Sequence, residues 1–131
     1  MAIKSEALMN KNVVVIEDDR DILDMIQYIL ADEGYNVSGY RHLEPIERII
    51  EKKPSVILLD NRLGDGFGNT LCLALKTNEE TKHIPVVMVS ASGGLEQIAL
   101  KCNADAFLAK PFDLEDLVKT VKYYSDLQPS Y

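Results

Sequence analysis

Five short apolar runs alternate with amphipathic segments along the chain. Residues 13–16, 55–59 and 84–89 form runs without polar alternation. Such runs predict strands that are buried on both faces of a sheet. Two further short segments, at residues 35–40 and 104–108, complete a set of five predicted strands.

The segments between the runs have the apolar spacing of helices. In the clearest case Ile22, Met25, Ile26, Ile29 and Leu30 share one face, and Gly34 ends the segment. Two further helices are predicted at residues 43–52, with Pro45 in the first turn, and at residues 69–78. A fourth follows Gly93-Gly94 and ends at about Cys102, and a last one begins after Asp113, which is expected to cap it. Alternating strands and helices predict parallel strands joined by helical crossovers. We therefore expect an α/β fold, a doubly wound five-stranded parallel sheet in the flavodoxin-like order 2-1-3-4-5 with five helices on both faces.

The length and composition fit one globular domain. The chain has 131 residues, of which 47% are hydrophobic and 27% charged, a balance typical of folded proteins. We divide it into a short N-terminal extension at residues 1–10, a folded domain at 11–126 and a tail at 127–131. No apolar run reaches about 18 residues, and residues 1–10 lack the core of a signal peptide. We therefore expect no membrane contact and a cytoplasmic location.

The charge and the cysteines exclude several classes of partner and site. Fourteen basic and 21 acidic residues give a net charge of −7, which disfavours nucleic-acid binding. Cys72 and Cys102 are far apart in sequence, so we expect neither a disulfide scaffold nor a cysteine zinc site. The glycine-rich segment 64–68 does not match a dinucleotide-binding or P-loop motif. Met25 and Met88 fall within apolar runs and are predicted to lie in the core.

Polar side chains collect where the predicted strands end. Glu17 and Asp18 follow the first strand, Asp60 follows the third, Ser90 the fourth and Lys110 the fifth. In the expected strand order these ends are neighbours at one edge of the sheet. Clustered carboxylates without histidine or thiolate favour Mg²⁺. The pattern indicates a carboxylate nucleophile that accepts a phosphoryl group, with Ser90 and Lys110 binding the phosphate oxygens.

Each of these residues also has an ordinary structural interpretation. Acids after a strand often cap the next helix, and Asp19 is well placed to do only that. A serine after a strand is usually a turn residue, and a lysine is usually a solvated charge. Their joint occurrence at four strand ends, in this order, favours a site.

Four motifs at these strand ends carry a resemblance to a known family. They are Val-Ile-Glu-Asp-Asp after the first strand, Leu-Leu-Asp at the third, Val-Ser-Ala at the fourth and Ala-Lys-Pro-Phe after the fifth. Each motif is weak alone, but the ordered set is specific. Over about residues 11–125 the chain resembles the receiver domains of two-component response regulators. The resemblance implies a single-domain receiver over residues 11–126, with no output domain in this chain.

The resemblance also implies a role for each residue of the set. Asp60 would be the phosphoacceptor. Asp18 would bind Mg²⁺ directly, Glu17 would act on it through water, and the carbonyl of Arg62 would complete the protein ligands. Lys110 would pair with Asp60 and then with its phosphate.

A switch and a set of partners follow from the same resemblance. Ser90 would hydrogen-bond the phosphoryl group, and Phe107 would match the switch aromatic, whose rotamer follows Ser90. The Lys110-Pro111 bond is often cis in this family. The donor would be a histidine kinase or a histidine phosphotransfer protein, and a downstream protein would read the surface of the last two helices and the fifth strand. The chain would catalyse only its own phosphorylation and dephosphorylation, so it would not be an enzyme for a separate substrate.

Dimerisation and two other functions stay open at this point. Four side chains could serve either the core or a phosphorylation-dependent homodimer: Leu95, Ile98, Leu117 and Tyr124. An aspartyl-phosphate phosphatase would usually have a second aspartate two residues after the nucleophile, where this chain has Arg62. An unphosphorylated receiver-like module would usually lack an acid or the lysine, and this chain has both.

Three positions depart from the family pattern. Gly64 replaces a proline that the family often has, so we expect the loop at residues 64–68 to be unusually mobile. Arg62 is a long cation at a position that influences the lifetime of the phosphoryl group. Phe107 lacks a tyrosine hydroxyl, so its outward rotamer gains no hydrogen bond from that group.

Overall fold

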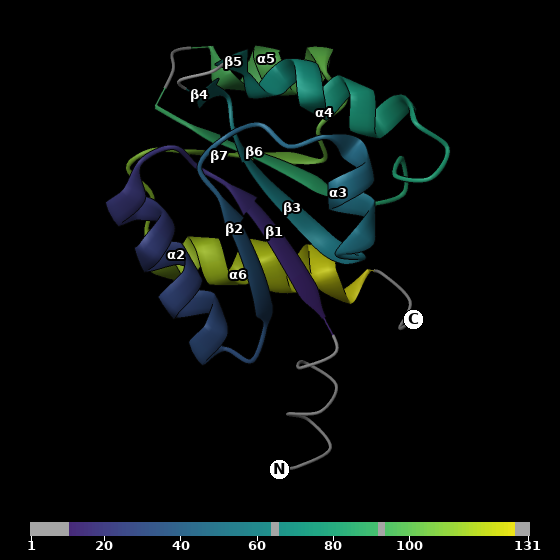
Figure 1. Ribbon diagram of the computed structural model, residues 1–131. Helices are drawn as coiled ribbons and strands as arrows, with labels where there is room; N and C mark the ends of the chain where they lie inside the picture. The colour runs from purple at the N-terminus through teal and green to yellow at the C-terminus, as the bar shows by residue number, and fades with distance from the viewer. Residues whose placement is uncertain (1–10, 64–65, 92–93, 128–131) are drawn as a thin grey trace.

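The computed structural model describes residues 11–63, 66–91 and 94–127 and has one parallel sheet between two layers of helices (Figure 1). The predicted extension at residues 1–10 and most of the tail at 127–131 lie outside the described residues. Their assignment therefore stays a prediction.

The main sheet has the predicted strand order. Its neighbours run β2-β1-β3-β6-β7, and every pair is parallel, which confirms the order 2-1-3-4-5. Each boundary differs from its prediction by no more than about two residues, as boundaries read from sequence commonly do. The strands are β1 (Asn12–Ile16), β2 (Asn36–Tyr40), β3 (Pro54–Asp60), β6 (Val86–Ser90) and β7 (Ala106–Ala109).

Helices cover both faces of this sheet (Figure 1). They are α2 (Arg20–Asp32), α3 (Ile46–Glu51), α4 (Gly68–Thr77), α5 (Leu95–Lys101) and α6 (Leu114–Asp126). Helices α2 and α6 pack on one face, and α3, α4 and α5 pack on the other. Among the described residues, no helix is long and apolar enough to cross a bilayer.

The central strands divide their side chains between two cores. In β1, Val13 and Val15 pack toward α2 and α6, whereas Val14 and Ile16 pack toward the other three helices. All four side chains are at most 1% exposed, because successive residues of a strand point to opposite faces. This two-sided burial explains the apolar runs without alternation, and each such side chain contributes about 1.5–3 kcal/mol of burial free energy.

The ends of the helices show where local sequence signals succeed and fail. Asp19 caps α2 as expected, because its Oδ1 accepts a hydrogen bond of 3.1 Å from the amide of Ile22. Gly34 follows that helix with a φ of 96°, a conformation that favours glycine. Pro45 lies at the N-cap of α3 rather than in its first turn. Asp113 occupies the N-cap of α6, but its side chain makes no capping hydrogen bond, so that part of the prediction was wrong.

The glycine-rich segment after β3 contains paired backbone that we did not predict. The strands β4 (Arg62–Leu63) and β5 (Gly66–Phe67) form a small antiparallel sheet, and α4 begins at Gly68. A strand of two residues has no hydrophobic period that a sequence could reveal. Residues 64–65 lie outside the described residues, so the expected mobility of this loop is not tested.

Candidate functional site

The carboxyl ends of four neighbouring strands bring the predicted site residues together. Glu17 and Asp18 follow β1, and Asp60 ends β3. Ser90 ends β6, and Lys110 follows β7. Because these strands are parallel and adjacent, all five residues lie at the same edge of the sheet.

Three carboxylates form the centre of the site. One oxygen each from Glu17, Asp18 and Asp60 lies within 4.8 Å of the other two. Glu17 is 2% exposed and Asp60 is 5% exposed. Buried carboxylates at this distance repel one another unless a cation lies beside them.

Lys110 is the cation that the structure places beside two of these acids. Its Nζ lies 2.6 Å from Oε1 of Glu17 and 3.2 Å from Oδ2 of Asp60. Burial alone would lower the pKa of Lys110, but the hydrogen bonds and negative charges of the two carboxylates raise it above the ordinary value. The ammonium therefore stays protonated where the chemistry needs a positive charge.

Glu17 is the most buried of the three acids. Burial, opposed by the hydrogen bonds of Lys110 and of the Asp19 amide and assisted by the charge of Asp60, raises the pKa of Glu17 to about 7. Its Oε2 accepts a hydrogen bond of 3.1 Å from that amide. Its Oε1 is fully buried and lies against the ammonium of Lys110.

The donor set fits a hard divalent cation. Three carboxylates converge and, among the described residues, no thiolate or imidazole belongs to the cluster, which is a donor set that suits Mg²⁺. The residues that could hold the ion are Glu17, Asp18 and Asp60. Arg62 lies next to them. Its backbone amide donates a hydrogen bond of 3.0 Å to Oδ1 of Asp60. The role of its carbonyl stays a prediction.

The predicted switch residues lie on the two strands nearest to Lys110. Ser90 is 2% exposed, and its carbonyl accepts a hydrogen bond of 3.1 Å from the amide of Lys110. Phe107 is 42% exposed and borders a pocket of about 270 Å³ between α5 and β7. The aromatic ring is therefore in an outward position. The Lys110-Pro111 bond is cis, as the resemblance implied.

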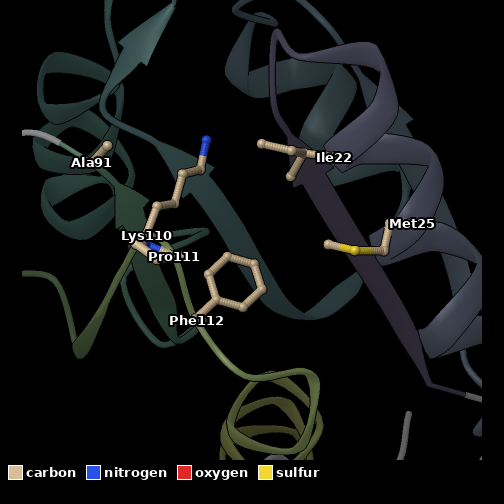
Figure 2. A pocket seen from close by; sticks show the side chains of 6 residues that line it. All are labelled: Ile22, Met25, Ala91, Lys110, Pro111 and Phe112. Atoms are coloured by element: carbon tan, nitrogen blue, oxygen red, sulfur yellow. The ribbon is translucent and has the colours of Figure 1, made fainter.

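Sequence reasoning missed an apolar pocket beside the site. Its volume is about 340 Å³. In Figure 2, Ile22 and Met25 of α2 and Phe112 extend toward the space between them, and the stem of Lys110 lies above Phe112. Met25 is 38% exposed, so its assignment to the core was wrong, whereas Met88 is fully buried as predicted. The full lining is Ile22, Met25, Ala91, Lys110, Pro111 and Phe112.

The structure assigns to the core two of the four side chains that could serve either the core or a homodimer. Leu117 is fully buried in the core, and Tyr124 packs against the same cluster. The hydroxyl of Tyr124 also donates a hydrogen bond of 3.1 Å to the carbonyl of Asp105. Both residues therefore serve the fold. Ile98 is half-buried in α5, and the side chain of Leu95 lies outside the part that the structure describes.

Comparisons with known proteins agree with this geometry. A CheY-like receiver domain protein from Methanospirillum hungatei is 28% identical; the match covers 89% of this chain and 94% of that chain, with a TM-score of 0.81. A protein described as a response regulator from Chloroflexus aurantiacus is 27% identical, with 88% and 98% covered and a TM-score of 0.81. The receiver domain of a sensor histidine kinase from Pseudomonas aeruginosa is 22% identical, with 88% and 98% covered and a TM-score of 0.77, a likeness of fold.

The sequence itself matches a family over most of its length. Residues 13–122 match the response regulator receiver domain family, and this range includes the three acids, Ser90, Phe107 and Lys110. The chain therefore belongs to the receiver domains of two-component signalling.

Proposed function

We propose that Asp60 accepts a phosphoryl group from a phosphohistidine donor. The observation that carries this proposal is the placement of the Asp60 carboxylate between a protonated Lys110 and two further acids at the strand ends. The imidazole nitrogen of the donor keeps the electron pair of the P–N bond as that bond breaks, while an oxygen of Asp60 forms the new O–P bond. The chain acts on itself, so it is not an enzyme for a separate substrate.

Glu17, Asp18 and Asp60 would hold Mg²⁺, with the carbonyl of Arg62 as a further ligand. The bound ion would supply positive charge that offsets the negative charge of the incoming phosphoryl group. The convergence of three carboxylate oxygens within 4.8 Å of one another supports this assignment. The receiver domain of the sensor histidine kinase from P. aeruginosa has a magnesium ion coordinated in its active-site cleft, which is consistent with it.

Lys110 and Ser90 would bind the phosphoryl oxygens after transfer. Lys110 already faces Asp60 at 3.2 Å, so its ammonium needs little movement to pair with the new anion. Ser90 would donate its hydroxyl to the same group, and Phe107 would turn from its outward position toward the space beside Ser90. The surface formed by α5, β7 and α6 would then differ between the two states and signal to a downstream protein.

The donor would be a histidine kinase or a histidine phosphotransfer protein. The apolar pocket beside Lys110 supports a protein donor, because Met25 and Phe112 offer it apolar contact area next to the site. We place the reaction in the cytoplasm, and the free thiols of Cys72 and Cys102 support a reducing compartment. Homodimerisation on phosphorylation stays a prediction.

The test is the intact mass of the chain after incubation with acetyl phosphate, with and without Mg²⁺, for the parent and Asp60→Asn. We expect a single phosphoryl adduct that requires Mg²⁺ and is absent from the variant. An adduct that persists in Asp60→Asn, or that forms equally without Mg²⁺, contradicts the proposal. Turnover of an external phosphate ester would instead support a phosphatase.

A further inference from the structure

Asn61, directly after the proposed phosphoacceptor, binds the start of the next helix with two of its oxygens. Its carbonyl accepts a hydrogen bond of 2.7 Å from the amide of Gly68, and its Oδ1 accepts one of 3.1 Å from the amide of Asn69. These amides belong to the first turn of α4 and have no partner within that helix. Asn61 is only 3% exposed, which is uncommon for an amide side chain.

The chain leaves this point at residue 61 and returns to it at residue 68. A Cβ on Gly68 would lie 2.2 Å from the carbonyl oxygen of Asp60, so the approach requires glycine. On the other side, the amide of Arg62 donates to Oδ1 of Asp60 at 3.0 Å. The backbone of residues 60–62 is therefore bound both to α4 and to the carboxylate.

The intervening segment is rich in glycine. Gly64, Gly66 and Gly68 occur within five residues, and each glycine adds backbone entropy that folding must overcome. The paired part of the segment is only two residues on each side. A direct connection from Asn61 to α4 avoids this segment altogether.

We infer that Asn61 is a positioning residue for the phosphoacceptor, an inference that rests on the proposed function. Its two oxygens connect the backbone of residues 60–62 to α4, so that the carboxylate of Asp60 and the carbonyl of Arg62 keep their places. Asn61 touches neither the metal ligand atoms nor the incoming phosphoryl group in this scheme.

The main test is Asn61→Leu, which keeps the branched shape of the side chain in a somewhat larger volume and removes the Oδ1 acceptor. We expect the dissociation constant for Mg²⁺, measured by calorimetry, to rise roughly tenfold. We also expect the maximal rate of phosphorylation by acetyl phosphate at saturating Mg²⁺ to fall roughly tenfold, with little change in the concentration for half-maximal rate. A merely structural role would lower the midpoint of thermal unfolding and leave both quantities unchanged well below it.

Asn69→Pro removes the same hydrogen bond from the donor side. Proline is tolerated in the first turn of a helix, where the amide has no helical partner. We expect it to reproduce the effects of Asn61→Leu, and the double variant to be no worse than either single variant. Thr70→Ala, at an exposed position of the same turn, is the matched control and should behave as the parent does.

Amide hydrogen exchange separates this inference from the proposed function. Without Mg²⁺ or a phosphoryl donor, the amide of Arg62 should exchange faster in Asn61→Leu than in the parent, because its partner Asp60 is no longer fixed. A parent chain that takes no phosphoryl group would overturn the proposed function, and the exchange rates would still decide the role of Asn61. A folded Asn61→Leu variant with the parent's exchange rate and Mg²⁺ affinity overturns the inference. A double variant in which the fold-changes of Asn61→Leu and Asn69→Pro multiply also overturns it.

Discussion

At the scale of single residues, Lys110 and a bound Mg²⁺ would compete for the same carboxylates. The ammonium lies 2.6 Å from Glu17 and 3.2 Å from Asp60, so a divalent cation must enter against its repulsion. We expect Lys110→Met to bind Mg²⁺ several-fold more tightly and yet to accept a phosphoryl group at least about tenfold more slowly. Calorimetry and intact mass measure the two quantities.

The control for this prediction is a lysine away from the site. Lys101 is exposed near the end of α5, and Lys101→Met should change neither quantity. Weaker Mg²⁺ binding by Lys110→Met would show that the lysine organises the acids rather than competing with the ion.

A second residue-scale prediction concerns the buried tyrosine Tyr35. Its hydroxyl lies 3.0 Å from Oγ of Ser125, and burial raises its pKa above the ordinary value of 10, while the Ser125 hydrogen bond lowers it. The raised pKa means that the stabilising contribution of the neutral phenol is complete below about pH 10 and is lost as the pH rises through the folded value. Tyr35→Phe should cost about 1 kcal/mol of unfolding free energy at about pH 8.

The difference in unfolding free energy between Tyr35→Phe and the parent should then become smaller at about pH 11, because only the parent must bury a phenolate. Urea unfolding at both pH values measures it, and the other titrating groups cancel in the difference. A difference in unfolding free energy that becomes larger at high pH would show that ionisation of the Tyr35 phenol does not destabilise the parent.

At the scale of elements, one set of contacts between α4 and the strands β6 and β7 lies apart from the site. Lys76 of α4 donates to Oδ2 of Asp105 at 2.8 Å and to the carbonyl of Ile84 at 2.9 Å. The same carboxylate accepts a hydrogen bond from the amide of Val86, the first residue of β6. Ile84 and Asp105 come just before β6 and β7, so these contacts lie at the opposite end of the sheet from the acids.

Lys76→Met should therefore lower stability without affecting the site. We expect a loss of about 1–2 kcal/mol of unfolding free energy, because the carbonyl of the buried Ile84 loses a donor and the exposed Asp105 loses its ion pair. The Mg²⁺ affinity measured by calorimetry should not change. A parallel loss of Mg²⁺ binding would mean that the two ends of the sheet are coupled.

The apolar pocket between α2 and Phe112 supports a prediction about donors. Met25→Asp puts a charge where a protein donor would make apolar contact, so transfer from a phosphorylated histidine protein should fall about tenfold or more. Acetyl phosphate is too small to use that contact, and its rate should stay within about twofold. Leu73→Asp is the matched control, since Leu73 is 43% exposed in α4 on the other face of the sheet.

Equal losses with both kinds of donor would show that Met25→Asp perturbs the site itself. A Leu73→Asp variant that loses transfer as strongly would show that added acidity, rather than the pocket, weakens the encounter with the donor.

At the scale of the whole molecule, topology was predictable because it depends on repeated, additive signals. Strands such as residues 13–16 and 55–59 are buried on both faces, and this leaves a pattern along the chain itself. The order of the strand ends is then sufficient to place Glu17, Asp60 and Lys110 together. Their convergence follows from parallel topology and needs no detail of side-chain packing.

Contacts between single side chains were not predictable in the same way. The hydrogen bonds of Asn61 join residues that a turn brings together, and no periodic signal marks them. Met25 has helical spacing like its buried neighbours, but only the packing of α2 against the segment after β7 shows that it borders a pocket. Asp113 has the right residue type for a cap, yet its side chain makes no capping bond.

The strong acidity of the molecule leads to the last prediction. A net charge of −7 and three converging carboxylates mean that any ion bound at the site stabilises only the folded chain. Unfolding free energy should then rise by about 1.4 kcal/mol for each tenfold increase in Mg²⁺ above its dissociation constant. Asp18→Asn should abolish this dependence, because it removes one of the three carboxylates.

General screening of charge predicts a different result. It would stabilise the parent and Asp18→Asn alike, and NaCl of matched ionic strength would reproduce it. Urea unfolding in graded MgCl₂ and in matched NaCl separates the two effects. If NaCl alone stabilises the chain as much as MgCl₂ does, the folded molecule responds to its overall charge, and the acidic cluster is no specific site for the ion.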